Sequence, residues 1–172
     1  ASDKGEVAVH IASNNIKGGE MAAEYIVSKL GEGTPVAELE GIPGASASRE
    51  RGQGFHNIAD KKLKVLAKQS ANFDRSQGLT VSENILQANP DVKAIFAQND
   101  EMALGAISAA KAANKQIFII GFDGTDDGVK AVKDGTMAAT IAQQPDKMGE
   151  IGVDAALKLA KGENVEKNIA VD

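Results

Sequence analysis

The sequence predicts an α/β fold in which helices cover both faces of a parallel sheet. Short runs of branched apolar residues alternate with longer amphipathic stretches along the 172 residues. This alternation is typical of strands that are buried between two layers of helices. Glycine or polar residues bound most of the apolar runs, as expected at the ends of strands. No internal repeat or Gly/Ser linker interrupts the series, so any domain boundary lies inside the alternation.

The apolar runs predict the strands in order. Most of the runs are four or five residues long, and they are rich in Val, Ile, Leu and Ala. We expect strands at residues 7–11, 36–39, 63–67, 94–97, 117–121 and 138–142, with a further strand within residues 165–171.

Apolar residues at helical spacing lie between the strands, and capping residues mark the helix ends. Gly31 ends the first helix, Pro90 follows the third, and Pro145 suits the first turn of the last. Asn99 or Asp100 is the natural N-cap of the fourth helix. The expected helices are residues 18–30, 48–60, 77–88, 101–113, 126–133 and 145–161.

Composition excludes several classes of function. The net charge is −5 and no cluster of Lys and Arg could follow a phosphate backbone, so we expect no binding to nucleic acid. No apolar run is long enough to insert into a membrane. The chain has no cysteine, and His10 and His56 lack partners at metal-binding spacing. Ser46 and Ser48 have no evident histidine base. We therefore expect no metal, no cofactor and no catalytic residues: the chain is predicted not to be an enzyme.

Polar and aromatic residues follow the predicted strands where ligands bind to an open parallel sheet, outside the carboxyl ends. Arg51 lies in the helix after the second strand, Phe73 follows the third, Asn99 the fourth, Asp123 the fifth and Gln143 the sixth. Amides, a carboxylate and a guanidinium suit sugar hydroxyls, and a ring suits the C–H face of a sugar. One Arg and one Asp cancel in charge, which favours a neutral ligand over a phosphate or a carboxylate.

Each of these positions, taken alone, also has a structural interpretation. Polar residues at strand ends commonly start turns and cap helices. Asp100 is expected to be a helix cap, and Arg49 a surface or interlobe ion-pair partner. Packing is expected for three phenylalanines, Phe55, Phe96 and Phe118, whereas the place of Phe122 stays open. Only the set of five points to a site.

Several longer motifs resemble one family. They are AQNDEMALGA (97–106), GFDGT (121–125) and TIAQQPD (140–146), supported by SRERG (48–52) and NFDR (72–75). With these motifs the chain resembles periplasmic sugar-binding proteins of the ribose-binding type. The resemblance implies two α/β lobes that close on a sugar in the cleft between them. It implies that Arg51, Asn99, Asp123 and Gln143 bond the sugar hydroxyls and that Phe73 stacks on the ring.

The resemblance also implies a division of the chain. Residues 1–11 would be a remnant strand of an N-terminal lobe, residues 12–143 a complete C-terminal sugar-binding lobe, and residues 144–172 a helix and strand of the N-terminal lobe. Hinge crossings are expected at residues 12–15 and 142–145. The family has a further half-lobe before the counterpart of Ala1 and a last strand after that of Asp172. About half of the cleft is then expected here, with millimolar or weaker affinity and an exposed apolar patch on Met148, Ile151, Ala155 and Leu159.

The function implied is that of the periplasmic substrate-binding component of a D-ribose ABC transporter. Such a protein delivers its sugar to a membrane permease and also presents it to a chemoreceptor, and it is expected to be a monomer when full length. The alternative is the effector-binding core of a LacI-type transcription repressor, which shares the fold. A helix-turn-helix in the upstream sequence would favour repression, and a signal peptide would favour transport.

Overall fold

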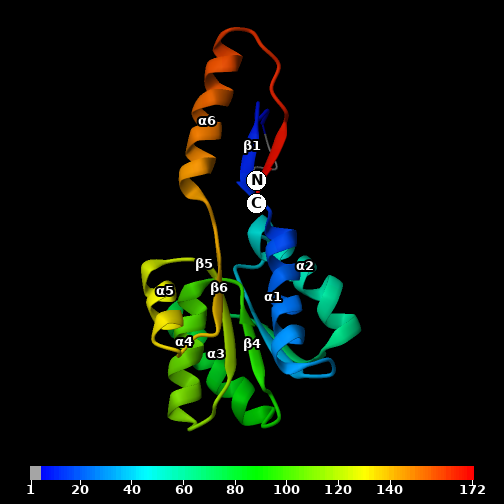
Figure 1. Cartoon of the computed structure of the whole chain (residues 1–172), viewed down its shortest axis with the longest axis vertical. Helices are drawn as coiled ribbons and strands as arrows, with labels where there is room; N and C mark the ends of the chain where they lie inside the picture. The colour runs from blue at the N-terminus through cyan, green and yellow to red at the C-terminus, as the bar shows by residue number, and fades with distance from the viewer. Residues whose placement is uncertain (1–4) are drawn as a thin grey trace.

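The structure, a computed structural model that describes residues 5–172, consists of a large lobe and a small unit (Figure 1). The two are joined where β1 enters α1 and where β6 leads to α6. The elements in chain order are β1 (His10–Ser13), α1 (Asn15–Leu30), β2 (Pro35–Glu40), α2 (Ser46–Lys62), β3 (Lys64–Ser70), α3 (Arg75–Ala88), β4 (Ala94–Ala97), α4 (Asp100–Ala112), β5 (Phe118–Asp123), α5 (Asp126–Lys133), β6 (Ala139–Ala142), α6 (Pro145–Ala160) and β7 (Asn168–Val171).

The large lobe is built on a five-stranded parallel sheet with the order β3-β2-β4-β5-β6. Leu39, one residue before the end of β2, pairs with Ala97 at the end of β4, so these two strands finish at nearly the same level. The strand order reverses between β2 and β4. In open α/β sheets such a reversal is where ligands bind, outside the carboxyl ends of the strands.

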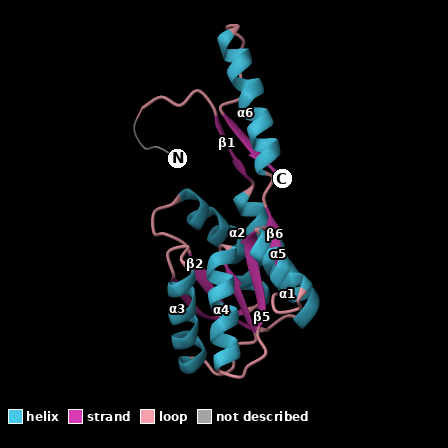
Figure 2. Cartoon of the chain, turned by 90° about the vertical axis from the view of Figure 1, so that its left-hand side faces the viewer, coloured by secondary structure: helices cyan, strands magenta, loops and turns pink. Residues whose placement is uncertain are grey.

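Each face of this sheet has its own apolar core. Figure 1 shows α3, α4 and α5 on one side of the strands and α1 and α2 on the other, and in Figure 2 α4 lies in front of the strands. On one face α3, α4 and α5 pack over the strands, and Met102 and Ile95 are fully buried there. On the other face α1 and α2 pack together, and Phe55 of α2 stacks on Phe96 of β4 with ring centroids 4.8 Å apart. Phe118 is half-buried against Tyr25. The predicted fold class and the packing roles of these three phenylalanines are confirmed.

Capping explains why several elements are longer than predicted. The side chain of Asn14 accepts a hydrogen bond from the backbone N–H of Lys17 at 3.2 Å, so α1 begins three residues before the predicted Gly18. The carboxylate of Asp74 likewise accepts from the N–H of Gln77 at 2.8 Å and starts α3 at Arg75. Strand pairing, rather than capping, explains the length of β3, which continues to Ser70 because β2 pairs with it as far as Glu40.

The small unit consists of β1, β7 and α6. The strand β1 pairs in parallel with β7, with His10 opposite Asn168 and Ser13 opposite Val171. The prediction of a strand at residues 7–11 is therefore displaced by two to three residues, because pairing with β7 rather than apolar character sets its position. The expected crossings are also shorter: Asn14 alone separates β1 from α1, and Gln143 and Gln144 separate β6 from α6.

The predicted apolar patch on α6 is wrong in its position. Ala155 is only 4% exposed, and Gly152 on the same side of the helix lies near Ile11 of β1. That side packs on the strands of the small unit, and Met148 and Ile151 are half-buried. The exposed large apolar residues of α6 are Val153, Leu157 and Leu159, of which only Leu159 was predicted.

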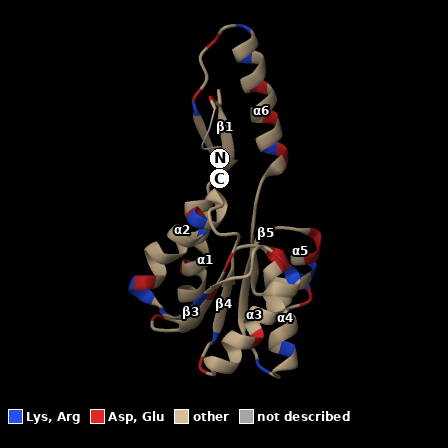
Figure 3. Ribbon diagram, turned by 180° about the vertical axis from the view of Figure 1, so that it is seen from behind, with Lys and Arg blue, Asp and Glu red and all other residues tan. Residues whose placement is uncertain are grey.

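Charged side chains of both signs are intermixed over the helices of the described chain (Figure 3). Arg75 illustrates the pattern, because it pairs with Glu101 of α4 at 2.8 Å and with Asp127 of α5 at 2.9 Å. Within residues 5–172, none of the helices combines the length and the apolar character that crossing a bilayer requires.

Candidate functional site

Arg51 lies at the centre of the candidate site. It projects from α2 and is 5% exposed. Its Nε donates to Oδ1 of Asn15 at 3.0 Å, and its Nη1 donates to the carbonyl of Gln98 at 2.5 Å and to Oδ1 of Asp123 at 3.2 Å. The guanidinium carbon lies 3.7 Å from the centroid of the Phe122 ring, a cation–π contact. Burial lowers the pKa of Arg51, and the charge of Asp123 opposes this effect.

Asp123 ends β5 and brings a carboxylate to the same edge of the sheet. Its Oδ1 accepts hydrogen bonds from Arg51 and, at 2.7 Å, from Nε2 of Gln143. Burial raises the pKa of Asp123 above its ordinary range, whereas the positive charge of Arg51 lowers it. The backbone φ of Asp123 is +123°, a conformation that side-chain-bearing residues rarely adopt and that is often found at functional sites.

Gln143 connects the lobe with the small unit. Its Nε2 donates to Asp123, and its Oε1 accepts from Oγ of Ser13 in β1 at 2.6 Å. Both of its amide atoms are therefore used in one orientation. Gln143 lies between β6 and α6, and Ser13 lies at the end of β1. The side chain of Gln143 therefore links the two chain segments that connect the large lobe with the small unit.

Phe73 and Asn99 form the other half of the candidate site. Phe73 has a φ of +60° and follows Asn72 with a φ of +54°. Nδ2 of Asn99 donates to the carbonyl of Phe73 at 3.1 Å, and Oδ1 of Asn99 accepts from the N–H of Met102 at 3.0 Å. Asn99 thus caps α4 and holds the turn that carries Phe73. The ring of Phe73 has its centroid 6.0 Å from the guanidinium carbon of Arg51.

The structure brings all five predicted site residues to one edge of the sheet. Arg51, Asp123 and Gln143 are joined directly by hydrogen bonds. Asn99 holds Phe73, whose ring faces toward the same guanidinium. This edge is the carboxyl end of the strands, where the strand-end rule places a ligand.

Sequence reasoning missed three residues of this cluster. Asn15 accepts a hydrogen bond from Arg51. Because Asn15 is the first residue of α1 and follows no strand of the large sheet, the strand-end rule does not select it. Phe122 is 2% exposed and its ring packs against the guanidinium of Arg51. The role of Phe122, which the sequence left open, is therefore to support Arg51. The backbone carbonyl of Gln98 accepts a hydrogen bond from Arg51. No sequence signal marks Phe122, because the close approach of Gly18 to its ring, 2.5 Å from a Cβ placed there, is seen only in the structure.

Asp100 and Arg49 also differ from their predicted roles. The N-cap of α4 is Asn99, and Asp100 is a fully buried carboxylate in the first turn. It accepts from Oγ1 of Thr140 at 2.6 Å and from both the N–H and Oγ1 of Thr125. Arg49 is exposed in α2 and donates to the carbonyl of Gly44 in the loop that precedes this helix. It therefore holds that loop, and no ion pair of Arg49 is found among the described residues.

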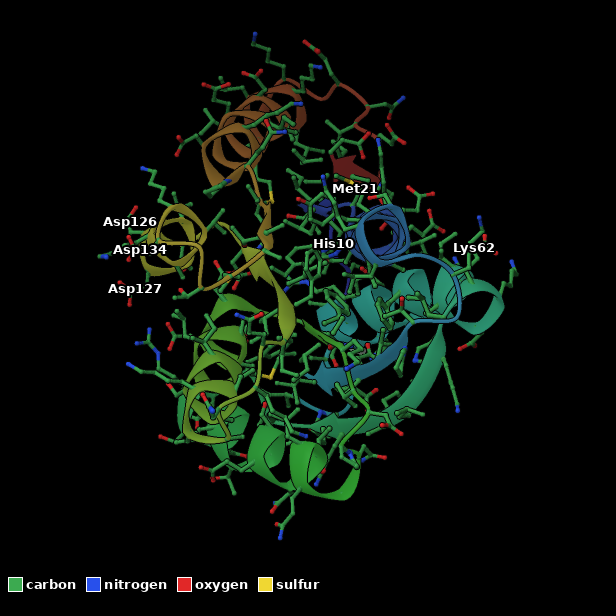
Figure 4. The ribbon with its side chains drawn as sticks, turned by 60° about the horizontal axis from the view of Figure 1, so that its bottom comes forward. His10, Met21, Lys62, Asp126, Asp127 and Asp134 are labelled. Carbon is green, nitrogen blue, oxygen red and sulfur yellow. The ribbon has the colours of Figure 1, made fainter. Side chains whose placement is uncertain are left out.

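Two hollows flank the site. One lies between α1 and β6 and has a volume of about 410 Å³, with Met21, Phe122, Ile141 and Gln143 among its lining residues. Figure 4 shows Met21 and His10 near the junction of the lobe and the small unit. The other, about 620 Å³, lies over β2 and β3 and is lined by charged residues that include His56. Among residues 5–172, no group of three His, Asp or Glu side chains is placed to hold a metal.

Comparison with known proteins decides the family. A periplasmic binding protein domain matches residues 1–164. The chain belongs to the periplasmic binding protein family. It is 62% identical over 170 residues to the ribose import binding protein of Haemophilus influenzae, which covers 98% of this chain and 58% of that relative. The corresponding protein of Bacillus subtilis is 55% identical over 170 residues, 99% of this chain and 56% of the relative.

Solved structures of periplasmic binding proteins agree with this assignment. An ABC transporter solute binding protein from Actinobacillus succinogenes with bound D-allose matches with a TM-score of 0.89 and 36% identity, over 95% of this chain and 59% of that one. The binding protein of an arabinose ABC transporter from Shewanella matches with a TM-score of 0.90 and 32% identity, over 95% and 57%. The chain spans less than 60% of the length of each relative named here.

Membership in the periplasmic binding protein family settles two expectations. The relatives are sugar-binding proteins and not enzymes, so the prediction of a chain without catalytic function is confirmed. The relatives are named as import and binding proteins, so the alternative of a LacI-type repressor core finds no support and is set aside.

Proposed function

We propose that the chain is part of the substrate-binding component of a D-ribose ABC importer and forms one wall of its sugar site. Arg51, Asn99, Asp123 and Gln143 would bond the sugar hydroxyls, and Phe73 would stack on the ring. The observation that carries the proposal is the hydrogen-bonded group of Arg51, Asp123 and Gln143 beside Phe73. The proteins most similar in sequence include ribose import binding proteins, which supports ribose as the sugar.

The chemistry of this group suits a neutral polyol. Asp123 offers a second carboxylate oxygen beyond the one that Arg51 and Gln143 already bond, and a carboxylate oxygen can accept from two neighbouring hydroxyls. The charges of Arg51 and Asp123 oppose each other, and the Asp100 and Glu50 carboxylates also act on Arg51, so no net positive charge attracts an anionic ligand. An aromatic ring 6.0 Å from the guanidinium provides the apolar surface that the C–H face of a sugar requires.

The division of the chain at the crossings forms part of the proposal. Residues 5–13 and 145–172 of the described chain would belong to one lobe and residues 15–142 to the sugar-binding lobe, with hinges at Asn14 and at Gln143–Gln144; the boundaries expected from the sequence, after residues 11 and 143, shift because β1 pairs with β7 as far as Ser13. The pairing of β1 with β7 and the contact of α6 with β1 support it. A second wall of the cleft would come from the part of the relatives that this chain does not span, which implies weak binding by the chain itself.

The partners and the location follow from the same proposal. The protein would work in the periplasm, as a monomer when full length, and would deliver its sugar to a membrane permease and present it to a chemoreceptor.

Titration of the chain with D-ribose tests the sugar proposal. Because the expected affinity is millimolar or weaker, NMR chemical-shift changes are a better measure than calorimetry. We expect saturable shifts at Arg51, Phe73 and Asp123, and their loss in the variant Asp123→Ala. The exposed Asp126→Ala is the matched control and should bind as the unmodified chain does. Shifts confined to residues away from Asp123 would contradict the proposal.

A further inference from the structure

Gln98 is a fully buried polar residue that directly follows β4. Its Oε1 accepts from the backbone N–H of Gly41 and from Oγ of Ser48, both at 2.8 Å. Its Nε2 donates to Oε1 of Glu38 at 2.8 Å. The amide oxygen therefore meets two donors and the amide nitrogen meets an acceptor, so only one orientation of this side chain satisfies all three bonds.

This residue reaches both halves of the candidate sugar site. The backbone carbonyl of Gln98 accepts a hydrogen bond from Nη1 of Arg51 at 2.5 Å. Gly41, which its side chain holds, lies directly against the ring of Phe73: a Cβ on Gly41 would be 2.0 Å from the ring carbon Cζ. The next residue, Asn99, donates to the carbonyl of Phe73. A displacement of Gln98 would therefore move the supports of the guanidinium and of the aromatic ring together.

A buried acid–base pair holds Gln98 from behind. Glu38 is 0% exposed in the centre of β2, and its second carboxylate oxygen lies 2.9 Å from Nε2 of His56. Burial of a carboxylate is costly unless it is paired and hydrogen-bonded, and here His56 and Gln98 take one oxygen each. Gly52 of α2 leaves the space for this arrangement, since a Cβ there would lie 3.0 Å from Nε2 of Gln98 and 3.3 Å from Oε1 of Glu38.

The charged groups around His56 keep it in this role. Nδ1 of His56 lies 2.6 Å from Oδ1 of Asp60, one turn further along α2. Lys68 of β3 pairs with Glu40 of β2 at 3.3 Å in the same hollow, which Arg49 also lines. Hydrogen bonding to Glu38 raises the pKa of His56 to about 9, so the imidazole is charged at neutral pH.

We propose that Gln98, anchored by Glu38 and His56, is the positioning residue of the sugar site and fixes Arg51 and Phe73 without touching the sugar itself. This inference rests on the proposed function for its consequence, sugar affinity. Its structural content, the coupling of Gln98 to Arg51 and Phe73, does not depend on any ligand. The strand order supports it, because Gln98 directly follows β4 and Glu38 lies on β2, the two strands between which the order reverses.

The first experiment replaces the amide and keeps the size of the side chain, with Gln98→Met. NMR signals of the Arg51 Nε–H group and of the Phe73 ring are measured without sugar, and D-ribose is then titrated. We expect both sets of signals to move. The affinity for ribose should fall roughly tenfold, because residues that hold the binding side chains in place would be lost. Gln116→Met is the matched control, because Gln116 is exposed before β5 at the far end of the sheet, and it should change neither.

Two further variants separate positioning from packing. Glu38→Gln keeps an acceptor for Gln98, so the Arg51 and Phe73 signals should stay in place while the pKa of His56 falls by more than about one unit. Glu38→Leu removes the acceptor and should displace those signals. If Gln98→Met does not fold, Gly52→Ala crowds Gln98 and Glu38 without altering their chemistry, and it should displace the same signals.

The results distinguish this inference from the proposed function. A folded Gln98→Met or Gly52→Ala variant with unmoved Arg51 and Phe73 signals would overturn the positioning role. An unmodified chain that shows no response to ribose would count against the proposed function alone, since the signals measured without sugar still decide whether Gln98 positions the two residues.

Discussion

Nη1 of Arg51 lies 3.2 Å from Oδ1 of Asp123, although 72 residues separate the two in the chain. Arg51 comes from α2 and Asp123 from the end of β5, and the parallel sheet brings both to one edge. Had they lain on different sides of the lobe, a shared sugar site would have been impossible. Their contact makes the pair the natural place for mutational tests.

The variant Arg51→Lys should both destabilise the chain and weaken its binding to ribose. Lysine lacks the planar fork that lets Arg51 reach Asn15, Gln98 and Asp123 together. With buried acceptors left unpaired, the free energy of unfolding should fall by about 2–4 kcal/mol. Urea denaturation and an NMR ribose titration measure the two effects. The exposed Arg49→Lys is the control and should stay within about 0.5 kcal/mol; equal losses in both variants would argue against a special role for Arg51.

Close packing at Gly18 gives a second test of the Phe122 ring that supports Arg51. A Cβ on Gly18 would lie 2.5 Å from the Phe122 ring, so Gly18→Ala should push the ring toward the guanidinium. We expect a loss of about 1–3 kcal/mol in the free energy of unfolding. In Gly149→Ala, by contrast, nothing lies within 4 Å of the new methyl group, and the helix α6 should gain up to about 1 kcal/mol. Thermal or urea unfolding of the two variants would show opposite signs.

The strand-end rule found the five candidate residues because it depends only on the direction of the strands, which periodicity reveals. It missed Gln98 as a partner of Glu38 because β2 and β4 are neighbours in the sheet without being consecutive in the chain. It missed Asn15 because a helix start carries no strand-end signal. The face of α6 was predicted wrongly since Ala155 turns toward β1, and pairing of β1 with β7 fixes that direction.

Asp100 should contribute more to stability than a helix cap would. Its carboxylate accepts three hydrogen bonds from Thr125 and Thr140 and so joins α4 to the start of α5 and to β6. Asp100→Ala leaves these donors without a partner in a buried place, and we expect a loss of about 2–4 kcal/mol. Chemical denaturation measures it, with the exposed Asp126→Asn as control. A loss below about 1 kcal/mol, the usual value for a helix cap, would instead agree with the interpretation of Asp100 as a cap only.

Stability should fall as the pH rises through the range in which His56 loses its proton. The hydrogen bond that His56 donates to Glu38 raises the pKa of His56 from 6.5 to about 9, so the folded chain holds a proton that the unfolded chain releases at lower pH. The stabilisation is complete below the unfolded pKa of 6.5 and is lost as the pH passes 9. Because the ring is partly exposed, its size is about 1–2 kcal/mol.

Urea denaturation at about pH 6 and about pH 9.5 measures this difference, and NMR follows the imidazole directly. The variant His56→Gln cannot hold the proton, so its stability should change less between the two conditions. An equal change in both proteins would assign the pH dependence to other groups.

The paired charges of the site should make the chain prefer D-ribose to ribose 5-phosphate. A phosphate dianion would have to lose its hydration beside the Asp123 carboxylate, while the only nearby guanidinium, among the groups described for this site, already donates to Asn15, Gln98 and Asp123. We expect the phosphate to bind at least about tenfold more weakly in parallel NMR titrations. Asp123→Asn removes the repelling charge and should narrow that ratio even as it weakens ribose binding. If the phosphate bound the unmodified chain as well as ribose does, charge pairing could not be the basis of selection for a neutral sugar.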